Sequence, residues 1–159
     1  MTDLTNYKAK SGRFVPVWTL EIQTILEDVD KILDAVMVVH PLQYGRYQRN
    51  ASIAATGMET ARPEPGSTTD SHADGFTPGG TETYPMVELK LSIDRDASIL
   101  EKVMDAILEV HHYEEPVNLL RENWASRANY NPQSDNPNRW WNNGRGLPNK
   151  IAEIAPRTP

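Results

Sequence analysis

The sequence of 159 residues contains no cysteine. This absence excludes disulfide bonds, thiolate nucleophiles and cysteine-ligated zinc sites, and it suits a reducing compartment. The sequence also lacks an apolar run of the roughly 20 residues that a membrane-spanning helix needs. Residues 1–13 are polar and lack the apolar core of a secretory signal, so we expect a polar leader and a cytoplasmic protein.

Positive charge is scarce as well. The chain has 16 lysines and arginines against 22 aspartates and glutamates, which gives a net charge of −6. Because this balance leaves no broad basic surface, we predict neither a nucleic-acid nor a membrane partner. The sequence has no Gly-x-Ser-x-Gly nucleophile motif and neither of the common glycine-rich phosphate-binding motifs. We therefore assign no catalytic residue and do not expect an enzyme.

The sequence does contain two similar halves. In the first half, residues 15–23 alternate between apolar and polar side chains, which predicts a half-buried strand. Thr24 to Glu27 form a capping-box pattern that predicts the start of a helix, and this helix ends at His40 because Pro41 follows. Residues 44–55 predict a second strand.

The second half repeats this order. Residues 84–93 alternate cleanly, Ser98 to Glu101 form a second capping-box pattern, and the helix behind it ends at His111. A short strand over residues 115–121 follows. Two β-α-β units in tandem predict an α+β, ferredoxin-like β-α-β-β-α-β sandwich, with two helices on one face of a four-stranded antiparallel sheet.

The open face of this sheet is predicted to be partly apolar. We place five residues of the first and third strands there: Val17, Thr19, Met86, Glu88 and Lys90. A partly apolar open face is usually covered by another subunit, so we predict a homo-oligomer.

Irregular segments flank and interrupt the predicted domain, which we place at residues 14–122. Residues 56–83 have almost no apolar side chains and predict a long loop. This loop is either a disordered linker or a glycine-rich segment whose amides close over an anion. Residues 123–159 form a tail rich in asparagine, proline and tryptophan, in which Trp140 and Trp141 either pack on a neighbouring surface or recognise a partner.

Two imidazoles, a phenol and two carboxylates follow the second helix. Imidazole and carboxylate groups suit divalent transition metals, so His111, His112 and Glu114 are candidate metal ligands. Neighbouring residues of an extended segment point to opposite sides, so a further ligand would come from His40, His72 or another subunit. The alternative is that His111 is a buried helix-end histidine bonded to the backbone.

The segment Val-His-His-Tyr-Glu-Glu-Pro-Val, residues 110–117, carries a family resemblance. It resembles the His-Pro-Tyr-Glu-Glu-Pro signature of the NGG-interacting-factor-like proteins, a dinuclear metal hydrolase-like family. More narrowly, it resembles the CutA/PII-like domain that is inserted in some of them and that also occurs alone. The resemblance covers about residues 14–120. It includes the segments Gly45 to Tyr47, Thr56 to Gly66, Gly79 to Glu82 and Glu88 to Lys90, with departures at Glu59, Ala61 and His112.

The resemblance implies a ferredoxin-like fold, often trimeric in the PII/CutA group, and a module that responds to a small molecule or an ion. It implies no reaction, because the metal core of the full-length family lies outside this domain. We therefore predict a non-enzymatic, regulatory homotrimer that binds a small ligand or a divalent metal ion. The predicted ligand-binding residues are Arg62, Gly66, Tyr113 and Glu115, and the predicted metal ligands are His111, His112, Glu114 and His40.

Two alternatives from other functional classes stay open. In the first, the chain is a subunit of a metal-dependent hydrolase, with His111, His112 and Glu114 as metal ligands. In the second, it is a structural oligomer whose tail clamps a protein partner. In the main reading, ligand binding orders the loop over residues 56–83 and so changes the surface that a partner meets.

Overall fold

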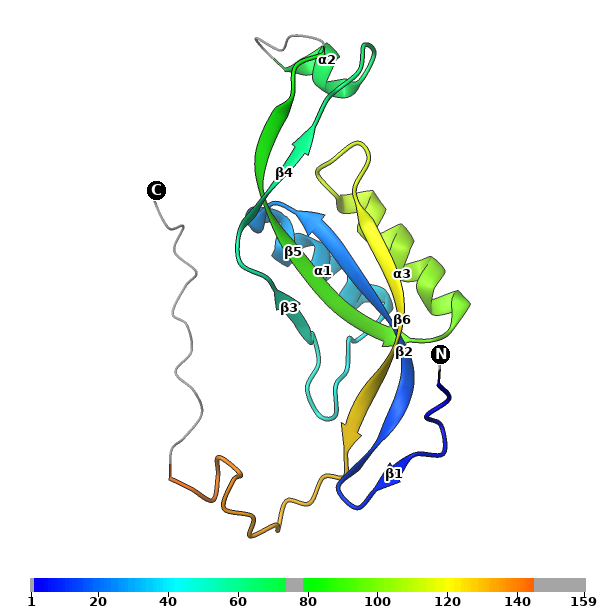
Figure 1. Cartoon of the computed structure of the whole chain (residues 1–159), viewed down its shortest axis with the longest axis vertical. Helices are drawn as coiled ribbons and strands as arrows, with labels where there is room; N and C mark the ends of the chain where they lie inside the picture. The colour runs from blue at the N-terminus through cyan, green and yellow to red at the C-terminus, as the bar shows by residue number, and fades with distance from the viewer. Residues whose placement is uncertain (1, 74–78, 145–159) are drawn as a thin grey trace. The chain divides into compact units, whose positions relative to one another are not determined.

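The computed structural model describes residues 2–73 and 79–144. They divide after Ala128 into two units. The described helices and strands lie in the first unit (Figure 1). In chain order they are β1 (Lys8–Ala9), β2 (Gly12–Thr24), the 3-10 helix η1 (Leu26–Asp28), α1 (Val29–Val39), β3 (Ala51–Ile53), β4 (Gly57–Ala61), α2 (Thr68–His72), β5 (Glu82–Asp94), α3 (Ala97–Val110) and β6 (Asn118–Ala128).

The sheet is antiparallel, with β2 and β5 at its centre. β6 pairs with the outer side of β2, and β3 pairs with the outer side of β5. The short strand β1 pairs with the beginning of β2, and β4 pairs with the beginning of β5. The strand order β6-β2-β5-β3, with a long helix after β2 and another after β5, confirms the predicted ferredoxin-like β-α-β-β-α-β fold.

The core lies between the sheet and the two long helices. α1 and α3 pack against each other and cover the same face of the sheet (Figure 1). The register places Leu20 opposite Leu91 and Ile22 opposite Leu89, so all four side chains point to this face. Ile107 of α3 is fully buried against them. Burying one side chain of this size contributes roughly 1.5–3 kcal/mol, so this layer holds the unit together.

The opposite face of the sheet carries a row of paired polar groups. The Glu21 carboxylate lies 2.9 Å from Lys90 Nζ and accepts a hydrogen bond from Arg121 Nε at 3.0 Å. The hydrogen bond from Lys90 is the largest contribution that lowers the pKa of Glu21. Thr19 Oγ1 accepts from Asn123 Nδ2 at 3.0 Å. Strand alternation places on this face all the residues predicted for it, namely Val17, Thr19, Met86, Glu88 and Lys90.

Both predicted capping boxes are wrong. Thr24 is the last residue of β2, where it pairs with Val87, and its buried hydroxyl has no hydrogen-bond partner among the described residues. At α3 the cap is Asp96, whose Oδ1 accepts from Ser98 N–H at 2.8 Å and from its hydroxyl at 2.7 Å. A carboxylate accepts these bonds more strongly than the Ser98 hydroxyl would, so the helix begins earlier than predicted.

The connection over residues 56–83 is not a continuous loop. β4 pairs residue by residue with the beginning of β5, from Gly57 opposite Met86 to Ala61 opposite Glu82, and α2 lies beyond this hairpin. Period-two alternation is weak here because the hairpin has no helix layer to bury one of its faces. Residues 74–78, which belong to the predicted loop, lie outside the described residues.

The predicted boundaries also shift. The second strand was predicted over residues 44–55, but only Ala51–Ile53 form it. β6 continues to Ala128, so the boundary predicted at residue 122 falls inside a strand. None of the helices in residues 2–73 and 79–144 combines the length and apolar character of a bilayer-crossing segment.

The described part of the second unit, residues 129–144, is a series of turns. Asn142 Nδ2 donates to the carbonyl oxygens of Ser134, at 2.6 Å, and Asn136, at 3.0 Å. The rings of Trp140 and Trp141 meet edge to face with centroids 5.8 Å apart, and both side chains keep about 40% of their surface exposed. The rest of the predicted tail, residues 145–159, lies outside the described residues.

Candidate ligand site

The His111 loop, which we define as residues 111–116, begins where α3 ends. His111 Nε2 lies 2.9 Å from the carbonyl oxygen of Gln23 on β2, and its Nδ1 accepts a hydrogen bond from Tyr113 N–H at 3.1 Å. A carbonyl can only accept and an amide N–H can only donate, so the imidazole carries its proton on Nε2. The backbone therefore uses both ring nitrogens.

The neutral form of His111 is favoured. Burial lowers its pKa below the ordinary value of 6.5, and the bond to Gln23 opposes this only in part. A second proton on Nδ1 would point at the Tyr113 N–H and break that hydrogen bond. In this conformation His111 fixes the backbone of the loop and has no free lone pair for a metal ion.

Three buried polar atoms near the His111 loop have no hydrogen-bond partner among the described residues. They are Asp28 Oδ2 in η1, Glu59 Oε2 in β4 and the hydroxyl of Tyr113. Buried polar atoms are normally paired, and each one left unpaired costs about 1–3 kcal/mol. These three atoms therefore keep hydrogen-bonding capacity that the described residues do not use.

The electrostatics of these groups show that they influence one another. Burial raises the pKa of Tyr113, and the charges of Glu59, Tyr84 and Asp28 raise it further. Burial also raises the pKa of Glu59, which pairs with Tyr84 across the β4–β5 hairpin. The cluster therefore contains a phenol that keeps its proton and a carboxyl group that gains one more readily than usual, so it can donate as well as accept hydrogen bonds.

The α2 segment is tied to the His111 loop through Glu114. Thr68, the first residue of α2, donates its N–H at 2.9 Å and its hydroxyl at 2.6 Å to Glu114 Oε2. These two bonds, with the hydroxyl contributing most, lower the pKa of Glu114. α2 lies at the far end of the β4–β5 hairpin (Figure 1), so Glu114 connects that end of the hairpin to the end of α3.

Only one of the four predicted ligand-binding residues lies in the cluster of unpaired atoms. This residue is Tyr113, whereas Arg62, Gly66 and Glu115 are exposed. Gly66 has a φ of 91°, and its N–H donates to Asp70 Oδ2 at 2.9 Å. This amide closes the turn before α2 and is not free to bind an anion.

The structure does not bring the predicted metal ligands together. His40 ends α1, and its Nε2 lies 3.7 Å from Asp94, which pairs with Val17. His111 contacts Gln23 at the opposite end of the β2–β5 pair. Because α1 and α3 follow successive antiparallel strands, their histidine ends lie at opposite ends of the sheet.

The remaining candidates do not complete a metal site within one chain. His112 Nδ1 lies 3.9 Å from Asp28 Oδ2, and Glu114 already accepts two bonds from Thr68. In the part of the chain that the structure describes, no three His, Asp or Glu side chains are grouped so that they would hold a metal ion. A metal at the His111 loop would therefore need a ligand from elsewhere.

Sequence reasoning missed Asp28, Glu59 and Tyr84. Asp28 lies within the predicted first helix, but the chain forms a 3-10 turn there and the carboxylate becomes largely buried. Glu59 was noted only as a departure from the family's glycine. A charged residue where a family has glycine was the one available signal, and the hairpin that buries it was not predicted.

Comparison with known proteins gives structural matches only. No protein-family model matches the chain, and no curated protein matches it in sequence. The structure of a Bacillus cereus protein related to NIF3 matches 72% of this chain with a TM-score of 0.54 and 17% identity. This match supports the ferredoxin-like fold. This chain spans 27% of the length of that Bacillus protein.

Two smaller proteins are also similar in structure. CutA1 from Ehrlichia chaffeensis, described as a divalent ion tolerance protein, matches 67% of this chain and 80% of its own, with 12% identity and a TM-score of 0.48. GlnK from B. subtilis, in its complex with ATP, matches 68% of this chain and 84% of its own, with 10% identity and a TM-score of 0.40. The match to the NIF3-related protein confirms, at the level of the fold, the resemblance stated from the His111 loop.

Proposed function

We propose that this chain is a non-enzymatic, regulatory, homo-oligomeric PII/CutA-like module that binds a small polar ligand or a metal ion at the His111 loop. The observation that carries the proposal is a set of three buried polar atoms, on Asp28, Glu59 and Tyr113, that have no hydrogen-bond partner among the described residues. The nearest charged group to Asp28 Oδ2 is His112, whose Nδ1 lies 3.9 Å away. They come from η1, β4 and the His111 loop, which are far apart in the sequence. A ligand at this place would recover the hydrogen bonds that folding leaves unmade.

The chemistry of the three atoms favours a ligand that carries hydrogen-bond donors. Two of them are carboxylate oxygens and the third is a hydroxyl that can donate or accept. A small molecule with an amine or amide group meets this requirement, as does a hydrated divalent cation. Arg62 and Glu115, which are exposed on the hairpin and the loop, would contact the outer part of such a ligand or a neighbouring subunit.

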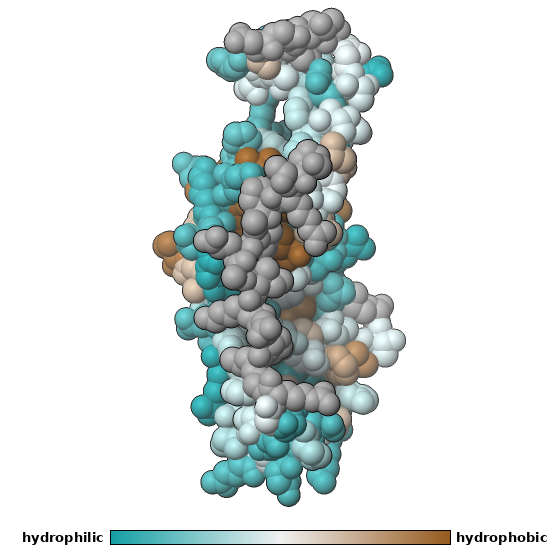
Figure 2. Space-filling model, turned by 90° about the vertical axis from the view of Figure 1, so that its left-hand side faces the viewer, coloured by the Kyte–Doolittle hydropathy of each residue, from teal (hydrophilic) through white to brown (hydrophobic). Residues whose placement is uncertain are grey.

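The oligomer is supported by exposed apolar side chains at the beginning of β6. Val117, Leu119 and Leu120 keep 42%, 45% and 48% of their surface exposed, and Leu119 and Leu120 point to opposite faces of the sheet. Figure 2, which views the molecule from the side of β3, also shows apolar patches in its middle part between polar regions. Patches of this kind are typical of subunit contacts. The trimeric state and the cytoplasmic location are our predictions from the resemblance and the composition.

The regulatory step is proposed to act through the contact between Thr68 and Glu114. β4 and α2 are already formed, so ligand binding would not need to fold the whole segment. It would instead strengthen or release the two bonds that join α2 to the His111 loop. A partner would then meet a different position of the hairpin.

Native mass spectrometry of the untreated protein tests this proposal first, because it reports subunit number and any retained ligand together. We expect an oligomer that carries a small molecule or takes up added Zn²⁺ or Cu²⁺. The double variant Glu59→Gln and Tyr113→Phe should lose that ligand. The matched control, Glu64→Gln with Tyr47→Phe, changes exposed residues outside the cluster and should keep it.

Three results would each contradict one part of the proposal. If the protein is a monomer at micromolar concentration, the proposed homo-oligomer is wrong. Identical ligand retention by the cluster variant and the control variant would remove the His111 loop as the site. Hydrogen-exchange protection of residues 57–73 that is the same with and without the retained ligand would remove the regulatory step.

The exposed tryptophan pair favours the structural alternative, in which the tail clamps a protein partner. Trp140 and Trp141 are stacked edge to face on a turn that asparagine side chains hold in place. Aromatic side chains pre-organised in this way are enriched at the centres of protein interfaces. Replacing both tryptophans with alanine should leave the oligomer intact and abolish partner binding if this alternative is correct.

A further inference from the structure

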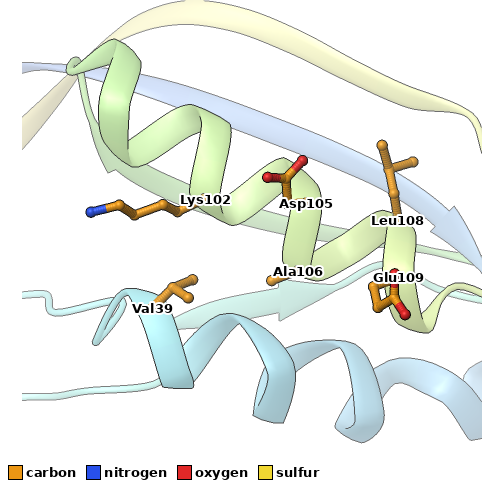
Figure 3. Close-up of a pocket in the computed structure, with 6 residues that line it drawn as sticks. All are labelled: Val39, Lys102, Asp105, Ala106, Leu108 and Glu109. Atoms are coloured by element: carbon orange, nitrogen blue, oxygen red, sulfur yellow. The ribbon is translucent and has the colours of Figure 1, made fainter.

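A groove of about 670 Å³ is lined by the end of α1 and by α3, as far as the last turn before the His111 loop. Its lining comes from the end of α1 and from α3: Val39, Lys102, Asp105, Ala106, Leu108 and Glu109. Figure 3 shows Val39 at the end of α1, directed toward α3, and Ala106 on the side of α3 that faces α1. The small side chain of Ala106 leaves the space open, so the groove is a consequence of alanine at this position.

The apolar part of this surface is unusually exposed. Val39 keeps 41% of its surface exposed, the adjacent Val38 keeps 85%, and Leu108 keeps 49%. If these side chains stayed in water, replacing them with polar ones would cost the protein little stability. Val39 and Leu108 lie toward opposite ends of the lining (Figure 3), and exposed apolar side chains that border a groove are typical of a surface that a partner covers.

The charged part of the lining is not balanced within the chain. Asp105 and Glu109 are four residues apart on α3, so their carboxylates lie on the same side of the helix, where like charges destabilise it slightly. Neither has an ion-pair partner among the described residues. The single cation of the lining, Lys102, interacts with Asp96 at the beginning of α3. A cationic partner would remove this repulsion.

We propose that this groove is the docking site for a cationic amphipathic helix of a partner protein. Apolar side chains of that helix would enter the space above Ala106 and beside Val39. Its lysines or arginines, one helical turn apart, would pair with Asp105 and Glu109. The groove has the volume of a small binding pocket, so it takes a few anchoring side chains rather than a whole helix. The net charge of −6 favours the approach of such a partner.

The test uses a synthetic helical peptide of about 18 residues, with leucines on one face and lysines at i, i+4 spacing on its border. Its binding to the full-length protein is measured by fluorescence anisotropy at physiological salt. The double variant Asp105→Lys and Glu109→Lys should weaken binding by about tenfold or more. Ala106→Leu, which fills the groove without changing charge, should weaken it to a similar extent.

The matched control is Glu27→Lys with Glu64→Lys, which makes the same change in net charge at exposed positions outside the groove. It should keep most of the affinity. Equal weakening by the control and the groove variant would overturn the proposal in favour of general charge attraction. Unchanged affinity in Ala106→Leu would overturn it as well. If the groove variants alter the native mass without peptide, the groove belongs to a contact between copies of this chain, and the proposal is wrong.

Discussion

The two halves of the first unit end their long helices with the same side-chain contact. In the first half, Nδ1 of His40 accepts a hydrogen bond from the N–H of Leu42 at 3.1 Å. In the second half, Nδ1 of His111 accepts from the N–H of Tyr113, also at 3.1 Å. Both histidines leave the helix in an extended conformation, so the backbone turns at the same place in each half.

The residue two positions after the histidine differs between the halves. Leu42 is 1% exposed and belongs to the core, whereas Tyr113 is half-buried and its hydroxyl has no partner among the described residues. The same backbone device therefore completes the core in one half and supplies a polar atom to the candidate site in the other. Both turns fix the backbone, but only the second leaves a buried polar atom without a hydrogen-bond partner among the described residues.

The largest expected effect is the difference in stability between a variant of Leu42 and a variant of Tyr113. Leu42→Ala should lower the free energy of unfolding by about 2–5 kcal/mol, because it leaves a cavity in the core. Tyr113→Phe should change it by less than about 1 kcal/mol, because the hydroxyl it removes makes no hydrogen bond. Urea denaturation of both variants measures the difference. Comparable losses would show that both turns serve stability alone.

The second prediction concerns His111 itself. His111→Ala removes the bonds to Gln23 and Tyr113 and should cost about 1–3 kcal/mol, since it leaves a carbonyl and an amide unpaired. His111→Gln should recover part of this loss, because an amide side chain can both donate and accept. Thermal unfolding followed by circular dichroism gives the comparison. If the glutamine variant is no better than alanine, the two bonds do not hold the turn.

The third prediction is a pH dependence. The pKa of His111 is lower in the folded protein than its ordinary value of 6.5, so the unfolded chain binds a proton first as pH falls. The stabilisation is therefore complete above pH 6.5 and decreases as pH falls through the folded-state pKa. His111→Gln should flatten the stability profile between pH 7 and pH 5. A profile unchanged by this variant would assign the pH dependence to other groups.

The smallest expected effect on stability concerns the contact between α2 and the His111 loop. Thr68→Val removes the hydroxyl bond to Glu114, and hydrogen exchange of residues 67–72 should become faster while the midpoint of unfolding hardly moves. Thr69→Val is the matched control, because it makes the same replacement one residue later in α2. Equal acceleration in both variants would show that valine, rather than the lost bond, loosens the segment.

The fold was largely readable from the sequence where one face of an element is buried. Val87, Leu89, Leu91 and Ile93 alternate with polar residues because β5 has a helix-covered side, and both long helices show their buried stripe in the sequence. The caps were misplaced because several nearby polar residues compete for the same amide groups, and Asp96 prevailed over Ser98. The β4–β5 hairpin was missed because neither of its faces is covered by a helix.

The candidate site was only partly readable. The sequence pointed to the His111 loop, and Tyr113 and Glu114 have defined roles there. It also named His40 as a metal ligand together with His111, but the chain places these two histidines at opposite ends of the sheet. Equivalent positions in two repeats do not lie close together when the repeats run in opposite directions along the sheet.

The sequence by itself determined the alternation of strands and helices, the two histidine-ended helices and hence the ferredoxin-like order, because these depend on local periodicity and turn chemistry. Only the tertiary structure decided that Asp28, Glu59 and Tyr113 come together with unpaired atoms, and that Asp105 and Glu109 border an open groove. Burial and pairing depend on which distant segments meet. The sequence pattern of a single segment does not predict which distant segment it will contact.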